Sequence, residues 1–237
     1  MGRSLRASAG GMIYHVLNRA NARRPFFDSA AEFAAFEEVL SEAQQAHSVP
    51  VLAFCIMPNH WHLVLAPVKD GDLSRFTAWL TLTHTQRWHV QHGSRGSGHL
   101  YQGRFKSFPV EEDEHFLTVC RYVERNALRA GLVRRAEDWR WGSLWRRAHP
   151  EAEPLVVLGD WPVSPPWNWV EWVNAPQTPR EEEALRRCTR RGQPFGSDQW
   201  VQETVERFAL ASTMHEPGRS KKAQASSAWL PFTENGA

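Results

Sequence analysis

The sequence predicts an α+β fold: a ferredoxin-like split βαβ sandwich with one antiparallel sheet, helices on one side, and a C-terminal helical extension. The hydrophobic pattern follows the order strand, helix, strand, strand, helix, strand, helix. Two apolar strands are separated only by the turn Met57-Pro58-Asn59-His60, which predicts a hairpin. The chain has 237 residues, 42% hydrophobic and 23% charged, as is typical of globular proteins.

Local signals place the first four elements. Residues 12–19 (MIYHVLNR) are β-branched and aromatic, which predicts the first strand. Ser29 followed by Glu32 is a capping-box pattern, and apolar residues at helical spacing extend the first helix to about residue 46. Residues 49–57 and 61–67 are the two strands of the hairpin.

The next elements follow the same logic. Asp72 is expected to cap a second helix that runs to about residue 92, and residues 101–110 predict the fourth strand. An acidic cluster then favours the start of a third helix over residues 113–130, with Gly131 just past its end.

We divide the chain into residues 1–150, which carry the predicted domain, and residues 151–237, which form an extension. Residues 151–179 are rich in Pro and Trp and contain no cation, so we interpret them as a wrapping segment. Thr178 and Ser197 each start a short helix, the first ending at Gly192. From Met214 onward the tail is polar and is expected to be loose.

Composition excludes several classes of protein. The longest apolar run, residues 51–57, is too short to cross a bilayer, and the first residues lack the apolar stretch of a signal peptide. Cys55, Cys120 and Cys188 are widely spaced and odd in number, as expected in a reducing compartment. We therefore expect a cytoplasmic protein without a membrane span.

The cationic residues are almost all arginines. Only four of the 28 are lysines, and the excess of cations over anions lies within residues 1–110. Arginine suits bidentate contacts to phosphate and stacking on bases, so this placement indicates an anionic partner. A GC-rich coding bias toward arginine is the alternative explanation of the composition.

The sharpest short motif is His60-Trp61-His62. Residues two apart on a strand point to the same face, so the two imidazoles project together while Trp61 points the other way. Two convergent imidazoles provide half of a divalent-metal site. Taken alone, the pair is also compatible with chance proximity, because the chain contains 11 histidines.

A second motif lies on the predicted third helix. Tyr122 falls roughly opposite the apolar face of that helix, and Asn126 follows one turn later on the same side. A tyrosine outside the apolar stripe is available for function, or else covers a neighbouring loop. The flanking arginines form a cationic surface that suits phosphates or is simply solvated; they are Arg121, Arg125 and Arg129.

Three segments together resemble a known family. They are Pro-Asn-His-Trp-His at residues 58–62, Gln-Gly-Arg-Phe-Lys-Ser at 102–107, and Arg-Tyr-Val-Glu-Arg-Asn at 121–126, continued by Ala-Leu-Arg-Ala-Gly-Leu-Val. They resemble the single-tyrosine HUH transposases, and among them the REP-associated tyrosine transposases, which are tied to repetitive extragenic palindromes. The similarity spans about residues 11–145. Residues 190–201 are also similar to the C-terminal element of that branch.

The resemblance implies roles for four residues. His60 and His62 would be the metal-binding pair, Tyr122 the nucleophile, and Asn126 the third metal ligand. Ala127 stands where the family usually has proline, which suits a continuing helix. The tail Pro-Gly-Arg-Ser-Lys-Lys is a weaker version of the family's ending, which leaves its contribution to DNA binding open.

The implied activity is DNA strand cleavage and rejoining through a 5′-phosphotyrosine and a free 3′-hydroxyl. A phenol, with a pKa of about 10, is a poor nucleophile at neutral pH, and a divalent ion on the scissile phosphate offsets this. We expect Mg²⁺ or Mn²⁺, with Zn²⁺ compatible on ligand type. The ester bond energy is stored in the adduct, so no nucleotide cofactor is expected.

The expected partner is single-stranded or hairpin DNA from repetitive extragenic palindromes, bound by a monomer or, alternatively, a dimer. Two other functions remain open: a domesticated protein that grips hairpins without productive cleavage, and a metal phosphohydrolase in which water attacks. The predicted DNA-contacting residues are all cationic and are Arg19, Arg23, Arg24, Arg104, Lys106, Arg121 and Arg125.

Overall fold

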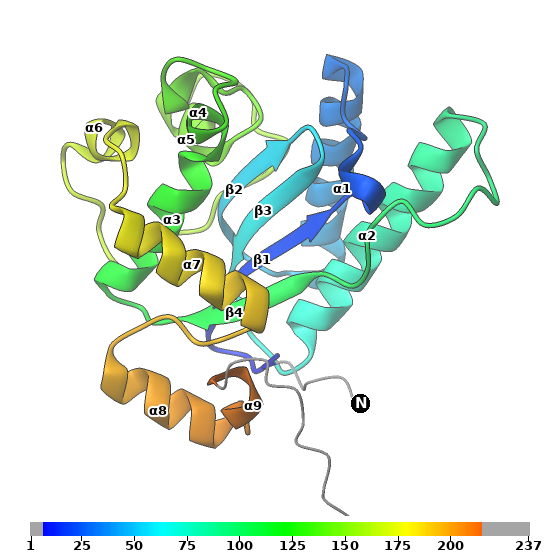
Figure 1. The fold of residues 1–237 in the computed structure, drawn as a ribbon. Coiled ribbons are helices and arrows are strands. Elements are labelled where there is room, and N and C mark those ends of the chain that lie inside the picture. The colour runs from blue at the N-terminus through cyan, green and yellow to red at the C-terminus, as the bar shows by residue number, and fades with distance from the viewer. Residues whose placement is uncertain (1–6, 215–237) are drawn as a thin grey trace, which may run out of the picture.

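The structure, a computed structural model, describes residues 7–214 of the chain. Its four strands form one antiparallel sheet in the order β2-β3-β1-β4 (Figure 1). The predicted tail after residue 214 lies outside the described residues. The strands are β1 (Ile13–Arg19), β2 (Val51–Met57), β3 (His60–Leu65) and β4 (Lys106–Val110).

The helices follow the strands in the predicted order. Two short 3₁₀ turns, η1 (Asn21–Arg23) and η2 (Ala136–Asp138), connect elements. The helices are α1 (Ala30–His47), α2 (Asp72–Gln91), α3 (Glu114–Glu124), α4 (Asn126–Arg129), α5 (Ser143–Ala148), α6 (Trp169–Asn174), α7 (Pro179–Arg191), α8 (Asp198–Arg207) and α9 (Ala211–Met214).

The predicted α+β class and the single antiparallel sheet are confirmed. The four strands together with α1 and α2 form the ferredoxin-like core. Both of these helices pack on one face of the sheet. The expectation that helices lie on one side holds only for this core. Helix α3 and parts of the extension cover the opposite face (Figure 1). The reason is that the strands carry apolar side chains on both faces of the sheet, so both faces must be shielded from water.

Helix ends follow the local chemistry. The Ser29 side chain accepts from the Glu32 N–H, and the Glu32 carboxylate accepts from the Ser29 N–H, so the predicted capping box is present. Thr178 and Glu181 form a second capping box at the start of α7, and Gly192 ends that helix in the left-handed conformation. Asp72 is the first residue of α2 rather than its cap, which is Gly71.

Buried hydrogen bonds fix the position of helix α3. Glu124 at the end of α3 accepts hydrogen bonds from the Ser143 hydroxyl at 2.6 Å and the Trp169 indole at 2.8 Å. Burial raises the pKa of the Glu124 carboxyl. These contacts tie α5 and α6 to α3, which contributes Tyr122 to the site. The division of the chain at residue 150 stays a prediction.

No helix within residues 7–214 is long and apolar enough to cross a membrane. The three cysteines are all free and buried.

Candidate active site

A basic cleft lies beside β1, β3 and the start of β4. Its volume is about 680 Å³. Seven cationic side chains line it, and no carboxylate is among the lining residues. The cationic residues are Arg19, Arg23, Arg104, Lys106, Arg129, Arg186 and Arg190. Such a cleft suits a polyanion.

His60 and His62 both line this cleft. Strand β3 brings them together as predicted: their ring centroids lie 5.1 Å apart, while Trp61 is fully buried in the core on the opposite face. Burial lowers the pKa of His60 to about 4, helped by the positive charges of Arg19 and Arg129. Burial also lowers the pKa of His62 well below its usual value. Both imidazoles are therefore neutral at physiological pH, as metal ligands must be.

The Nε2 atoms of these two rings have no hydrogen-bond partner among residues 7–214. In His60 the Nδ1 contacts the Asn59 carbonyl oxygen at 2.7 Å, and in His62 the Nδ1 contacts His15 Nε2 at 2.8 Å. Each ring thus keeps one nitrogen for a ligand in the cleft. Two such donors fit a divalent cation.

Tyr122 is the third side chain of the site. Its ring centroid lies 5.8 Å from that of His62, and the residue lines the same cleft. Tyr122 was expected opposite the apolar face of its helix, but only 6% of its surface is exposed, because its ring packs edge-on against His15 and His62 of the sheet and lies under the Arg129 guanidinium. The structure therefore brings the predicted nucleophile and the predicted histidine pair together.

The other two tyrosines of the chain are engaged elsewhere. The Tyr14 hydroxyl is hydrogen-bonded to the backbone of Ala9. The Tyr101 hydroxyl accepts from Trp61 Nε1 and contacts His84 Nδ1, within the core. Neither residue lines the cleft.

Arg129, which the sequence placed on the cationic surface of the helix without a role in the site, joins Tyr122 to Asn126. Its guanidinium donates to the Tyr122 phenol oxygen at 3.3 Å and to the Asn126 carbonyl oxygen at 3.2 Å, and it lies 4.6 Å from the Tyr122 ring centroid. Asn126 is buried, its Nδ2 has no partner among the described residues, and it is not among the cleft-lining residues. Its position beside Tyr122 agrees with the predicted helical spacing.

The predicted DNA-contacting arginines separate into two groups. Arg19, Arg23, Arg104 and Lys106 line the cleft, whereas Arg24 is exposed and does not. Arg121 and Arg125 point away from it: they donate to the backbone carbonyls at the end of α6 and just beyond it, those of residues 172–176. There they satisfy carbonyl groups that a helix end leaves without partners.

Helix α7 contributes residues that sequence reasoning did not assign to the site. Arg186, Thr189 and Arg190 lie on one face of this helix and line the cleft, while Leu185 and Cys188 are buried. The signal was present as an amphipathic pattern in the sequence, but nothing local connects it to Tyr122. Figure 1 shows α7 lying beside α3 and β4.

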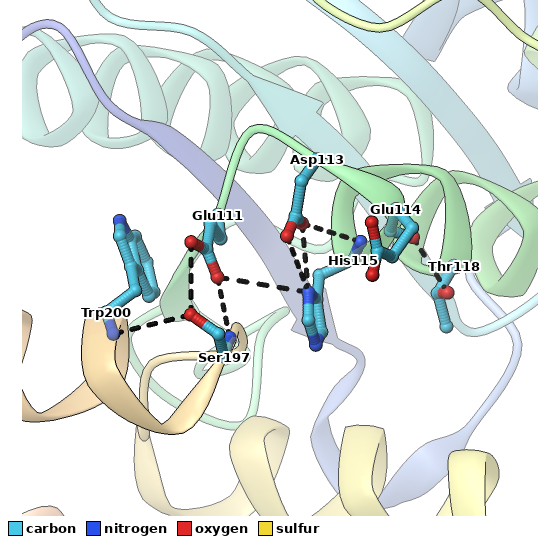
Figure 2. Close-up of polar contacts among 7 residues, drawn as sticks. All are labelled: Glu111, Asp113, Glu114, His115, Thr118, Ser197 and Trp200. Carbon is cyan, nitrogen blue, oxygen red and sulfur yellow. Dashed lines mark hydrogen bonds and ion pairs between the residues drawn. The ribbon is translucent and has the colours of Figure 1, made fainter.

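A second group of potential ligand atoms, in Glu111, Asp113 and His115, lies at the start of α3 (Figure 2). Its members already have structural partners. Asp113 accepts from the His115 N–H as the helix cap, and the His115 ring contacts the Asp113 carboxylate. Glu111 accepts from the backbone N–H of Ser197. We interpret this group as a helix cap that also holds the start of α8.

The histidine pair, the tyrosine and the basic cleft therefore form one candidate site that suits a polyanionic substrate. The profile of the family described as "Transposase IS200 like" matches residues 8–126, slightly more than half of the chain. The chain therefore belongs to this transposase family.

Two proteins of the REP-associated type are similar to this chain. A protein of Haemophilus influenzae, whose name assigns it provisionally to the REP-associated tyrosine transposases, is 24% identical over 139 residues, covering 55% of this chain and 76% of its own. A solved REP-associated tyrosine transposase, bound to a REP hairpin, matches with a TM-score of 0.53 and 17% identity, covering 68% of this chain and 93% of its own. The match to the solved structure shows that the fold is shared, and the family model confirms the resemblance to these transposases that the motifs indicated.

Proposed function

We propose that this transposase cleaves and rejoins single-stranded or hairpin DNA with Tyr122 as the nucleophile. The observation that carries the proposal is the placement of the three tyrosines. Only Tyr122 lines the basic cleft, and it does so next to His62, whereas Tyr14 and Tyr101 are bound elsewhere. An aromatic hydroxyl among seven cations is suited to attack on a phosphodiester.

In the proposed reaction the Tyr122 phenol oxygen attacks phosphorus in line. The phenol loses its proton, the new oxygen–phosphorus bond forms, and the bond from phosphorus to the 3′-oxygen breaks. The 3′-oxygen takes up a proton and leaves as a hydroxyl, while the 5′-phosphate stays on Tyr122. Attack by a 3′-hydroxyl on this adduct reverses the step, so no nucleotide cofactor is needed.

His60 and His62 are the proposed ligands of Mg²⁺ or Mn²⁺, which would supply charge neutralisation at the scissile phosphate. Their support is the pair of Nε2 atoms without partners in the cleft. Asn126 is the proposed third ligand. Its carbonyl oxygen accepts one hydrogen bond from Arg129, which leaves its second lone pair for a cation.

Arg129 is proposed to stabilise negative charge as it forms on the Tyr122 oxygen. We expect Arg129→Leu to reduce the cleavage rate by about a hundredfold, as removal of one donor from a charge-stabilising site does. Rates of cleavage of a hairpin oligonucleotide measure this. Arg134→Leu is the matched control, since Arg134 is exposed and outside the cleft. Equal rates for Arg129→Leu and the control would exclude Arg129 from the reaction.

The proposed partner is hairpin DNA from repetitive extragenic palindromes. It is supported by the REP hairpin bound to the solved relative and by the cleft without carboxylates. Arg19, Arg23, Arg104 and Lys106 are its proposed phosphate contacts. We propose that the protein acts as a monomer in the cytoplasm.

Helix α7 is proposed to extend this DNA surface. We expect the double change Arg186→Glu and Arg190→Glu to weaken hairpin binding by at least about tenfold and to reduce its dependence on salt, because phosphate contacts release counterions. Arg187→Glu together with Arg180→Glu is the matched control, because these two arginines line a different pocket. Fluorescence anisotropy with a labelled hairpin measures both. Equal weakening by the two pairs would assign the effect to net charge alone.

Covalent capture tests the proposed function as a whole. The full chain is incubated with hairpin oligonucleotides from its own genomic flanks and Mn²⁺, then resolved under denaturing conditions. A protein–DNA adduct at Tyr122 is the expected result. Binding without cleavage would instead favour a domesticated hairpin-binding protein, and cleavage without an adduct would favour attack by water.

A further inference from the structure

The two cleft histidines are each held through the Nδ1 atom by a residue outside the proposed ligand set. We propose that Asn59 and His15 are positioning residues that fix the tautomers of His60 and His62, so that both rings present an unprotonated Nε2 to the cleft. This rests on the proposed role of the two histidines as metal ligands.

Asn59 sets the tautomer of His60. The Asn59 amide nitrogen donates to the backbone carbonyl of Arg23 at 2.9 Å, which orients its carbonyl oxygen toward His60 Nδ1, 2.7 Å away. A carbonyl oxygen only accepts hydrogen bonds, so His60 Nδ1 must carry the proton. The lone pair of His60 is then on Nε2, in the form that binds a cation.

His15 plays the corresponding part for His62. Its Nε2 lies 2.8 Å from His62 Nδ1, and its Nδ1 has no partner among the described residues. The ring is held between Phe108, at a centroid distance of 4.8 Å, and His62, at 5.0 Å. A cation on His62 Nε2 requires the proton on Nδ1, and His15 Nε2 is the acceptor that keeps it there.

Strand geometry makes both contacts rigid. His15 lies on β1, the strand paired with β3, and Leu17 of β1 is directly opposite His62. Asn59 is in the β2–β3 turn, whose backbone carbonyl accepts from the Ala20 N–H beside β1. Both proton acceptors are therefore part of the sheet that carries the histidines, and the pair is arranged for a cation before one arrives.

The direct test is NMR of ¹⁵N-histidine-labelled, metal-free full-length protein near neutral pH. We expect both His60 and His62 to be protonated on Nδ1. In Asn59→Ala, His60 should lose this preference while His62 keeps it, and in His15→Phe the reverse should hold. Protonation of either ring on Nε2 in the unmodified protein would overturn the proposal for that ring.

Metal affinity gives a second readout. Calorimetry with Mn²⁺ should show binding weakened about 10- to 100-fold in Asn59→Ala. Losses of this size are typical when a residue that hydrogen-bonds to a metal ligand is removed. Asn59→Asp keeps an acceptor at this position and should restore most of the affinity. Asn21→Ala is the matched control, because it is the same substitution at an exposed asparagine in the nearby turn η1.

The outcomes separate this proposal from the proposed function. Unchanged tautomers and unchanged Mn²⁺ affinity in Asn59→Ala would overturn the role of Asn59, even if the enzyme is metal-dependent. Unchanged Mn²⁺ affinity in His60→Ala would instead overturn the proposed ligand pair, whatever the tautomers are. If His15→Phe does not fold, the spectrum of the unmodified protein still decides the tautomer of His62.

Discussion

Tyr122→Phe is expected to abolish the covalent protein–DNA adduct and to lower hairpin cleavage by about a thousandfold or more, the scale on which enzymes lose a nucleophile. Hairpin affinity should change by less than about threefold, because the cationic contacts to phosphate, which supply most of the binding free energy, are kept. The change removes only the hydroxyl, whose partner is Arg129, and keeps the ring against His62. Denaturing electrophoresis of the adduct and anisotropy of a labelled hairpin measure the two effects.

Tyr14→Phe is the control for this experiment. It makes the same chemical change at a hydroxyl that binds the backbone of Ala9, away from the cleft, so adduct formation should persist. An adduct retained by Tyr122→Phe would mean that another residue attacks the phosphate.

Much of the fold follows from local patterns in the sequence. The capping boxes at Ser29 and Thr178 and the left-handed Gly192 are set by chemistry within a few residues, and the structure contains all three. Helices α5 and α6 were not predicted. Each has six residues, too few for periodicity to mark them, and they are held by contacts such as Trp169 with the distant Glu124.

Local sequence patterns also could not predict that helices cover both faces of the sheet. All seven residues of β2 are buried, which requires cover on both faces of the sheet, but a continuous apolar strand does not say which segments provide it. The structure supplies α1 and α2 on one face and α3 with the extension on the other.

The site shows the same division between local and distant signals. The two-residue spacing of His60 and His62 on a strand directly predicts that they share a face, and the structure places both in the cleft. Arg121 and Arg125 looked like a cationic DNA surface because the carbonyls they bind belong to residues about 50 positions later. Likewise nothing near Tyr122 in the sequence indicates that α7 lines its cleft.

The second large effect is expected at the metal ligands. His60→Ala should lower cleavage by at least about a hundredfold at a fixed low concentration of Mn²⁺, which corresponds to about 2.7 kcal/mol. The reason is that one imidazole donor is lost while the phosphate still carries its full negative charge. A chelator should remove the activity of the unmodified protein, and added Mn²⁺ should restore it. Cleavage rates across a Mn²⁺ titration measure both.

The same titration ranks the three proposed ligands. His62→Ala should be at least as damaging as His60→Ala, with thermal unfolding as a check, because His62 is buried against His15. Asn126→Ala should only shift the Mn²⁺ midpoint upward, since an amide oxygen is a weak ligand and in this case is held by Arg129. His99→Ala is the control, because His99 is exposed and outside the cleft. If His60→Ala and His99→Ala have the same Mn²⁺ midpoint for cleavage, the cation binds elsewhere. If Asn126→Ala leaves the midpoint unshifted, Asn126 is not a metal ligand, and its role is limited to the hydrogen bond with Arg129.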